Sequence, residues 1–289
     1  MAHPVGIVSV CYRSMAVLPD MLASLPDGVP VVLVDNTGSD AEDGGLSKLA
    51  AEQGVTLISN SENKGFGAAC NQGAAALDTE FLLFLNPDAT LAEGALDALI
   101  SAATRHPKAS AFNPRIASPT GTPLFKRHTH LLPKSQRMPR GWPEEDKEIN
   151  VLSGAAFFVR RTAFEAVGGF DEKIFLYHED DDLALRLRQA CGPLMFVRSA
   201  LVMHLGGRST ARSRKTAALK AWHMGRSRVY ATRKHGRPLA FARALLSACR
   251  QLLSVSVLLS KRKRAKQAAY LKGVWSALKD GGASPRPAK

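Results

Sequence analysis

The sequence predicts an α/β fold, in which a largely parallel sheet is flanked by helices and followed by a basic helical C-terminal extension. The chain has 289 residues, 45% of them hydrophobic and 22% charged, a composition that is ordinary for globular domains and excludes disorder and fibrous repeats. Short apolar runs rich in β-branched residues, each too short for a buried helix, alternate with segments that can form helices. This alternation is typical of right-handed βαβ units.

The elements follow in order from the apolar runs and the segments between them. We expect strands at residues 5–11, 29–34, 55–59 and 80–85, and helices at residues 15–25, 66–77 and 91–104. After Phe112 the pattern becomes irregular. We expect a short hairpin at residues 114–125, a mobile loop over the site at residues 126–148, an apolar strand at 154–159, and helices starting near Thr162 and Leu183.

Each of the four N-terminal strands ends in polar, turn-forming residues, at positions 12–14, 35–40, 60–67 and 86–88. Ligands of parallel α/β sheets bind at the carboxyl ends of the strands. One such cluster alone is more simply explained as a turn or a helix cap. Four clusters on one edge predict a binding crevice.

Asp88 follows the apolar run FLLFLN, at a position where its carboxylate faces this crevice and can hold a hard divalent cation shared with substrate phosphates. The alternative is that Asp88 caps the helix expected from Leu91. His204 ends another apolar run (ALVMH) and can offer an imidazole ligand to the same cation. A single histidine in this position is more often structural.

The densest acidic cluster is EDDD at residues 179–182. The helix macrodipole stabilises acidic residues in a first turn, which accounts for one or two of the four. Consecutive carboxylates repel each other, and a cation or a proton-transfer role compensates that cost. A carboxylate whose pKa its neighbours raise toward neutrality suits removal of a proton from a hydroxyl group.

Several common site types are absent from the sequence. GFGAAC at residues 65–70 starts like a dinucleotide fingerprint, but it has Cys at the third small-residue position and follows the third strand. There is no P-loop, H-E-x-x-H or G-x-S-x-G motif. The four cysteines are far apart and no secretory signal is recognisable, so we expect a reducing, cytosolic compartment.

Charge is distributed very unevenly along the chain. Up to His204 there are 18 Lys and Arg residues against 24 Asp and Glu, a net charge of −6, and from Leu205 onward 21 against one, a net charge of +20. Such a tail is expected to meet a polyanion, either anionic lipid or nucleic acid, unless it is simply a solvated helical surface.

The sequence of the tail predicts helices from Lys215 onward, interrupted at Gly236 and Pro238. Residues 244–260 carry one charge and are followed at once by KRKR at 261–264, a pattern that is too short for a membrane span and typical of a helix lying in the membrane interface. Few aromatic residues lie among the tail's cations, which argues against single-stranded nucleic acid. We therefore favour an anionic membrane surface as the partner and expect no nucleic acid.

The ordered set of motifs resembles the inverting family 2 glycosyltransferases with the GT-A fold, and within them the rhamnosyltransferase-like branch. The resemblance spans residues 5–237 and rests on VGIVSVCYRS, VVLVDNTGSD, NSENKGFGAACNQG, FLLFLNPDA, VLSGAAFFVRR, GGFDEKIFLYHEDDDLALRLR, MHLGG and GRSRVYATRKHG. It implies a nucleotide-sugar-binding sheet at residues 1–207, with the basic helical region at residues 208–289.

The resemblance also implies roles for individual residues. Asp180 is implied as the general base within the Glu179-Asp180 pair, and Asp88 and His204 as ligands of Mg²⁺ or Mn²⁺ at an N-P-D version of the D-x-D motif. The implied nucleotide-sugar contacts are Cys11, Tyr12, Asp35, Asn63, Lys64, Gly65, Asn71, Asn86 and Asp88. Two departures bear on these roles: Cys11-Tyr12-Arg13 replaces the common Thr-Tyr-Asn, and Asp181 replaces a usually apolar residue.

The expected enzyme is a metal-dependent inverting glycosyltransferase of the hexosyltransferase type. It would move a sugar from a nucleoside-diphosphate donor, with dTDP-rhamnose favoured by the branch, to a hydroxyl of a glycan or lipid-linked acceptor in cell-surface polysaccharide synthesis. It would act in the cytoplasm, peripherally on the inner face of the cytoplasmic membrane. The alternatives are a sugar nucleotidyltransferase and a catalytically inactive basic adaptor for membrane or nucleic acid.

Overall fold

The computed structural model describes residues 3–38, 44–206 and 214–278. Its strands are β1 (Val5–Cys11), β2 (Val31–Asp35), β3 (Thr56–Ser59), β4 (Phe81–Leu85), β5 (Ala89–Leu91), β6 (Ala111–Ala117), β7 (Lys147–Ile149), β8 (Ala156–Arg160) and β9 (Leu194–His204). Its α-helices are α1 (Leu18–Ala23), α2 (Gly45–Glu52), α3 (Phe66–Ala75), α4 (Ala95–Arg105), α5 (Arg161–Ala166), α6 (Glu179–Ala190), α7 (Arg214–Lys234), α8 (Ala240–Leu252), α9 (Val255–Leu258) and α10 (Lys261–Ser276).

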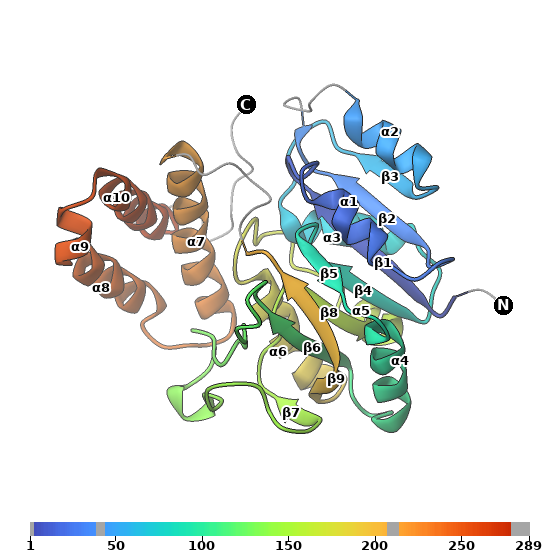
Figure 1. Ribbon diagram of the computed structural model, residues 1–289. Helices are drawn as coiled ribbons and strands as arrows, with labels where there is room; N and C mark the ends of the chain where they lie inside the picture. The colour runs from blue at the N-terminus through green and yellow to red at the C-terminus, as the bar shows by residue number, and fades with distance from the viewer. Residues whose placement is uncertain (1–2, 39–43, 207–213, 279–289) are drawn as a thin grey trace.

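The strands form one sheet in the order β3-β2-β1-β4-β8-β6-β9-β5, with β7 paired to β9 (Figure 1). Strands β3, β2, β1 and β4 are parallel to one another, whereas β8 runs antiparallel to β4. The expected α/β class is therefore confirmed, and the four polar strand ends do lie at one edge. Ser39 and Asp40, part of the expected second cluster, lie outside the described residues.

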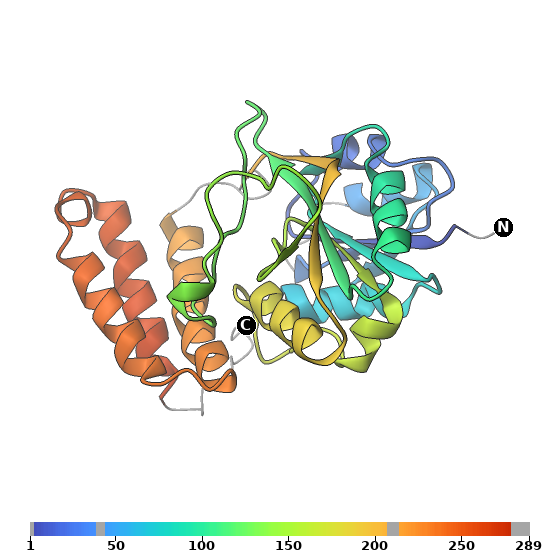
Figure 2. The same ribbon diagram turned by 90° about the horizontal axis from the view of Figure 1, so that it is seen from below.

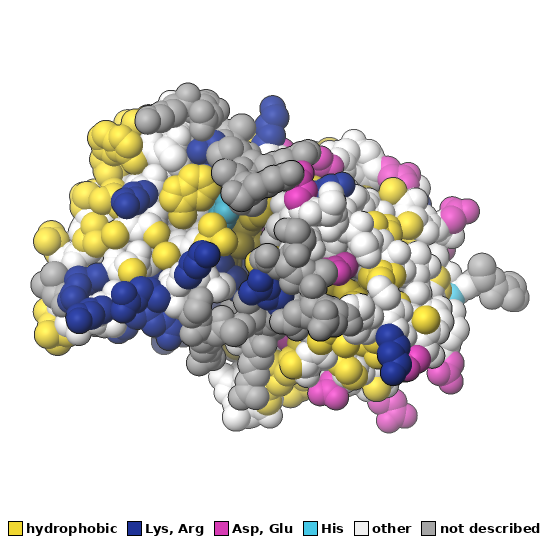
Figure 3. Space-filling view, turned by 90° about the horizontal axis from the view of Figure 1, so that it is seen from above, with side chains coloured by type: hydrophobic (Ala, Val, Ile, Leu, Met, Phe, Trp, Pro, Cys, Tyr) yellow, Lys and Arg dark blue, Asp and Glu magenta, His cyan; other side chains and the backbone are white. Residues whose placement is uncertain are grey.

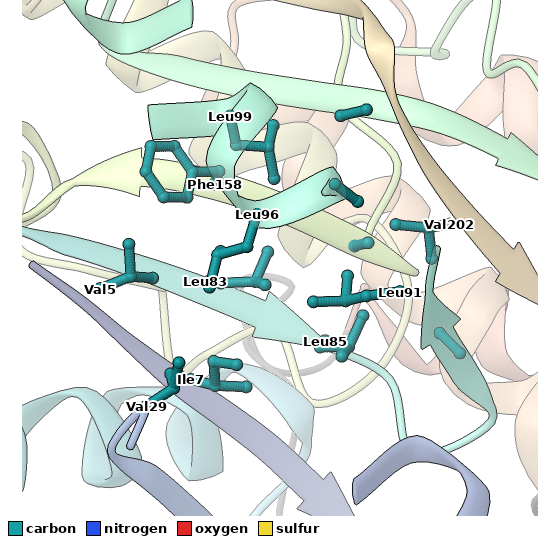
Figure 4. Close-up of a cluster of buried hydrophobic side chains, with 14 of the residues drawn as sticks. Val5, Ile7, Val29, Leu83, Leu85, Leu91, Leu96, Leu99, Phe158 and Val202 are labelled. Carbon is teal, nitrogen blue, oxygen red and sulfur yellow. The ribbon is translucent and has the colours of Figure 1, made fainter. Parts of the chain in front are cut away.

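Helices cover both faces of the sheet, because its strands carry apolar side chains on both faces (Figures 1 and 2). On one face α1, α2 and α4 pack on the strands, and Figure 4 shows Leu96 and Leu99 of α4 close to Leu83 and Phe158 of the sheet. The opposite face packs against α3, α5 and α6 through residues such as Phe84. The two buried layers fix the sheet edge as a rigid platform for the polar loops.

Three expectations from the sequence were wrong in detail. Leu91 does not begin a helix: it lies in β5, which pairs with β9, and α4 begins at Ala95 after Gly94. Asp88 therefore does not cap a helix there. Helix α6 begins at Glu179 and not near Leu183, so that the acidic residues form its first turn, as the helix-macrodipole interpretation of the cluster requires.

The region expected to be a hairpin and a mobile loop is more structured than predicted. Strand β6 pairs in parallel with β9, and the chain turns back so that Ala117 forms an isolated bridge with Pro123. Residues 134–136 then form a 3₁₀ helix, and β7 follows. The Gln136 carbonyl accepts a hydrogen bond from the Asn150 side chain (2.8 Å), which ties this segment to the body.

Helices α7 to α10 form a helical unit beside the sheet, on the side of α6 (Figures 1 and 2). The expected boundary between residues 207 and 208 lies outside the described residues. Helix α7 docks on the body through Ala231, which packs with Leu131, Ile174 and Leu185. The ring of His223 stacks on Phe175, with centroids 4.3 Å apart. Within the described ranges, none of the helices has the length and apolarity needed to cross a bilayer.

Candidate active site

The first two strand ends frame a small pocket beside α1. Its lining includes Cys11, Arg13, Asp35 and Thr37, and Asp35 Oδ1 accepts a hydrogen bond from the Thr37 backbone N–H (2.9 Å). Burial, and secondly the charge of Asp35, raises the pKa of the Cys11 thiol to about 12. Cys11 therefore shapes the pocket as a neutral thiol. Tyr12 lies beside Arg13, whose guanidinium carbon is 5.8 Å from the Tyr12 ring centroid.

Four amide side chains hold the third polar loop against the second. The Asn36 amide donates to Asn63 Oδ1 (2.9 Å) and to the Gly65 carbonyl (3.1 Å), and its Oδ1 accepts from the Lys64 backbone N–H (3.0 Å). Asn60 donates to Asn36 Oδ1 (3.2 Å) and exchanges two hydrogen bonds with Gln72 (2.9 and 3.1 Å). This network fixes the backbone at residues 63–65, where nucleotide-sugar contacts were predicted.

The predicted nucleotide-sugar residues of this loop are thus placed by structural contacts. Gly65 has φ +89°, and a Cβ added there would lie 2.5 Å from the Phe175 carbonyl oxygen, so only glycine fits. Asn71 points its amide at the Phe170 backbone, donating to the carbonyl (3.0 Å) and accepting from the N–H (2.9 Å). Asn71 holds the loop before α6, and its contact with nucleotide sugar stays a prediction.

Asp88 and His204 come together although they are 116 positions apart. Asp88 Oδ1 lies 3.1 Å from His204 Nε2, and their side chains are 3% and 17% exposed. The antiparallel pairing of Ala89 with His204 in β5 and β9 creates this proximity. The backbone of Asn86 donates to the Ala155 carbonyl (2.9 Å) and accepts from Ala89 N–H (3.0 Å), which shapes the turn that carries Asp88.

The pair fits a divalent cation. Two ligand atoms at about 2.1 Å from one metal and at right angles are about 3 Å apart, as these two atoms are. No set of three or more His, Cys, Asp or Glu side chains gathers around a common point within the described ranges. A cation held here would complete its coordination with water and substrate phosphates.

Asp180 is the acidic residue whose carboxylate lies at the mouth of the site, 16% exposed. Its Oδ2 accepts from Lys126 Nζ (2.6 Å) and the Gly154 N–H (2.9 Å), and its Oδ1 accepts from the Asp181 N–H (2.8 Å). A carboxylate has about four lone pairs. These three contacts leave one on Oδ1 for a substrate hydroxyl.

The other three acidic residues have different surroundings. Burial, and secondly the charge of Asp180, raises the pKa of Glu179 to about 8. Asp181 pairs with His178 and Lys126 (both 2.9 Å). Asp182 is fully buried and pairs with Arg186, Lys234 and His235, each at 2.8 Å. Cations from distant segments therefore compensate the cluster, and Asp182 serves to dock α7.

The Asp88–His204 pair and Asp180 belong to the same edge of the sheet. Residues 154–155 precede β8, which pairs with β4. Ala155 accepts from the backbone of Asn86 in the turn that carries Asp88, and Gly154 donates to Asp180. The two anionic positions are thus connected through adjacent residues of one loop. Beyond Asp180, a pocket extends toward α7 and α10.

The sequence reasoning missed several residues that organise this site. Asn36 and Asn60 were noted only as turn formers, and Gln72, Lys126, Lys234 and His235 were given no individual role. A polar residue within an otherwise apolar helix face was a signal available for Gln72. For Lys126, Lys234 and His235 there was none, because their partners lie 52 to 55 positions away.

Comparisons with known proteins agree with this architecture. The family model for glycosyl transferase family 2 matches residues 7–168. A Mycobacterium tuberculosis protein named N-acetylglucosaminyl-diphospho-decaprenol L-rhamnosyltransferase is 32% identical over 247 residues, covering 73% of this chain and 79% of the relative.

Two solved structures share the fold. One is GalNAc-T7 with UDP, GalNAc and Mn²⁺ (TM-score 0.60, 15% identity, 99% of this chain and 58% of that chain). The other is the mannosyltransferase PcManGT from Pyrobaculum calidifontis with GDP-Man and Mn²⁺ (TM-score 0.58, 14% identity, 96% of this chain and 87% of that chain). The chain has the GT-A type of α/β fold and belongs to glycosyl transferase family 2, in its rhamnosyltransferase-like branch.

Proposed function

We propose that the chain transfers a sugar from a nucleoside-diphosphate donor to an acceptor hydroxyl with inversion, and that Asp180 is the general base. The observation that carries this proposal is the loop at residues 154–155, which contacts the Asp180 carboxylate on one side and the turn bearing Asp88 on the other. A base and a candidate leaving-group site on one sheet edge suit a single displacement.

The chain's residues have distinct tasks in this mechanism. Asp180 Oδ1 accepts the proton of the acceptor hydroxyl while that oxygen attacks the anomeric carbon, and the Gly154 N–H and Lys126 hold the carboxylate in position. Asp88 and His204 would hold Mg²⁺ or Mn²⁺, which when bound neutralises charge on the departing nucleoside diphosphate. Asp35 and the loop at residues 63–65 would bind the nucleoside.

The relatives narrow the substrates we propose. The name of the M. tuberculosis relative states a rhamnosyl transfer to a lipid-diphosphate-linked N-acetylglucosamine. We propose dTDP-rhamnose as the donor and a lipid-linked or glycan acceptor of cell-surface polysaccharide synthesis.

We also propose that the helical unit rests on an anionic membrane surface from the cytoplasmic side. Large apolar side chains of α8 and α9 and the segments around them are exposed, namely Leu246 (61%), Leu253 (76%), Val255 (70%) and Leu259 (82%). The cations Lys261, Arg262 and Lys263 follow directly and are exposed as well. Figure 3 shows Lys and Arg side chains gathered on the helical unit, beside exposed hydrophobic side chains, and most of the visible Asp and Glu on the sheet body. Apolar side chains beside cations suit the boundary between headgroups and acyl chains.

A donor panel tests the transferase proposal. The purified chain is given dTDP-rhamnose and UDP-, GDP- and other dTDP-sugars with Mn²⁺ or Mg²⁺, and hydrolysis, melting shift and the anomeric configuration of the product by NMR are recorded. We expect one nucleotide class to stabilise the chain, with an inverted product. Failure of every nucleotide to shift the melting temperature, or a retained configuration, contradicts the proposal.

Asp88→Ala tests the cation site separately. We expect weaker Mn²⁺ binding and a loss of the Mn²⁺-dependent stabilisation by nucleotide, each measured against the metal-free form of the same variant. Metal affinity equal to that of the wild type would remove Asp88 from this role.

A further inference from the structure

A pocket lies between the sheet body and the helical unit, with Asp180 in its lining. The body contributes Asp180 and His130 to its lining, and the helical unit contributes Arg228 of α7 and Lys266, Gln267 and Tyr270 of α10. An acceptor whose hydroxyl reaches Asp180 can place its remaining atoms in this pocket, because Asp180 lines it.

The cations of this pocket differ in how their charge is compensated. Lys126 is paired with Asp180 and Asp181 at 2.6 and 2.9 Å, so its charge is already matched. Arg228 donates one hydrogen bond, to the hydroxyl of Tyr270 (2.8 Å), a neutral partner. Across the ranges that the structure describes, no carboxylate forms an ion pair with Arg228 or Lys266. Within those ranges, Arg228 and Lys266 thus face the pocket without a direct ion pair, although the carboxylates of Glu179, Asp180 and Asp181 also line it.

A second feature indicates a hydroxyl-bearing ligand. Gln267 Oε1 is buried and has no hydrogen-bond donor within the described part of the chain. A buried acceptor without a donor is costly, and a ligand hydroxyl at this position would satisfy it. Among the described residues, the pocket therefore combines the Asp180 carboxylate, two cations without a direct ion pair and an acceptor atom without a donor, which together suit a sugar carrying an anionic group.

We propose that this pocket binds the acceptor and that Arg228 and Lys266 bind its diphosphate, so that the acceptor class is a sugar joined through diphosphate to a lipid. This inference rests on the proposed function. Two cations match the two negative charges of a diphosphate diester, and guanidinium and ammonium groups are the usual phosphate ligands of proteins. The exposed apolar residues on the same helical unit place the lipid end of such an acceptor toward the membrane.

Binding of a soluble isoprenyl diphosphate tests the assignment without any turnover. Titration calorimetry with farnesyl diphosphate is carried out in EDTA, which keeps a cation out of the donor edge. We expect binding to the wild type and a roughly tenfold loss of affinity in each of Arg228→Gln and Lys266→Gln, since a charge-assisted hydrogen bond contributes about this much. Farnesol, inorganic pyrophosphate and UDP form the comparison arms.

Matched controls remove one charge from the same helical unit outside the pocket, in Lys215→Gln and Arg243→Gln. Their affinity for farnesyl diphosphate should equal that of the wild type, and Arg228→Lys should restore part of what Arg228→Gln loses. Equal weakening in the control variants would mean general charge attraction and would overturn the assignment. So would unchanged affinity in Arg228→Gln and Lys266→Gln, or binding of UDP that depends on the same two residues.

Kinetics then connect the pocket to transfer. With farnesyl-diphospho-N-acetylglucosamine as acceptor, both pocket variants should raise the acceptor KM about tenfold and leave the donor KM unchanged. With octyl N-acetylglucosaminide, which lacks the diphosphate, the variants should match the wild type. An equal rise for both acceptors contradicts the diphosphate assignment. Absence of transfer with every donor, while farnesyl diphosphate binding persists, counts against the proposed function instead.

Discussion

The two sides of the candidate site that we propose for the donor and the acceptor are built from different interactions. On the donor side, neutral amides from residues 36 to 72 hold the loops through short hydrogen bonds, as between Asn36 and Asn63. On the acceptor side, ion pairs join α6 to segments more than 50 positions away, such as Asp180 to Lys126 and Asp182 to Lys234. The amide-held loops of the donor side should therefore depend little on pH and salt, whereas the acceptor side should respond to both.

The difference reflects what each side must bind. A nucleotide needs a fixed shape, and a local hydrogen-bond network fixes shape without net charge. The acceptor side must accept a proton and, in our proposal, a diphosphate, so it needs charges that are held apart and partly matched. Asp182 connects α6 to the helical unit, because the same buried carboxylate pairs with Arg186 of α6 and with Lys234 of α7.

Removing the Asp182 charge should have the largest effect on stability, because it leaves cations of the acceptor side without their buried partner. Asp182→Asn leaves Lys234 and His235 without their buried partner, and we expect the free energy of unfolding to fall by about 3 kcal/mol. Chemical denaturation monitored by tryptophan fluorescence measures this change. Asp97→Asn, an exposed first-turn residue of α4, is the control, and an equal effect in both variants would show that Asp182 is not a clamp.

Membrane attachment extends the acceptor side and should depend on charge. Replacing Lys261, Arg262 and Lys263 by Gln should weaken binding to phosphatidylglycerol vesicles roughly a hundredfold, at about 1 kcal/mol for each cation. Co-sedimentation at low and high salt measures it.

The control for the vesicle experiment removes the same charge from the sheet body. Lys48, Lys108 and Lys147 are exposed, and their replacement by Gln should leave vesicle binding unchanged. Equal binding of the wild type to phosphatidylcholine vesicles would contradict an electrostatic attachment.

The loop at residues 63–65 on the donor side should be destabilised by a steric clash and not by the loss of a charge. Gly65→Ala places a Cβ 2.5 Å from the Phe175 carbonyl oxygen, whereas Gly94→Ala, also at positive φ (+70°), meets nothing within 4 Å. Both variants incur backbone strain, so we expect Gly65→Ala to lower the free energy of unfolding by about 2 kcal/mol more than Gly94→Ala. Equal destabilisation of the two variants in thermal unfolding would mean that the loop moves away from the added Cβ without a loss of stability.

The smallest effect that we expect is the response of the free energy of unfolding to acid, which should involve the acceptor side. Burial alone would raise the pKa of Asp182, but the hydrogen bond from His235 and the charge of Arg186 outweigh it and lower the pKa below the usual 3.8. The stabilisation is therefore present above pH 3.8 and is lost as pH falls through the lower, folded-state pKa. Denaturation between pH 6 and pH 3 should show the gap between wild type and Asp182→Asn narrowing only below about pH 3.8; a constant gap contradicts this.

The donor side could largely be predicted from the sequence because its interactions are local. The apolar runs indicated β1 to β4, and parallel strands bring their ends to one edge whatever the details. The amide network was within reach as a set of turn formers. The hydrogen-bonding pattern of the network could not be predicted, since the side chain of Asn36 could equally have bonded only within its own turn.

The acceptor side was less predictable because it depends on distant pairs. Asp180 was identified through a family resemblance. Four consecutive acidic residues are tolerated because of the neighbouring His178 and because of Lys126, Lys234 and His235, which only the fold brings near. Strand β5 was missed because three residues next to a proline turn carry too little pattern, and its pairing with β9 is what places Asp88 against His204.

The rate of transfer by Asp180→Asn is the most direct measurement of the central claim. With folding and nucleotide binding shown to match the wild type, we expect kcat to fall by about 10² to 10⁴, the usual contribution of a general base, with little change in the donor KM. Asp97→Asn should retain full activity. A kcat for Asp180→Asn within a few fold of the wild type, in a folded protein that still binds nucleotide, would contradict the account.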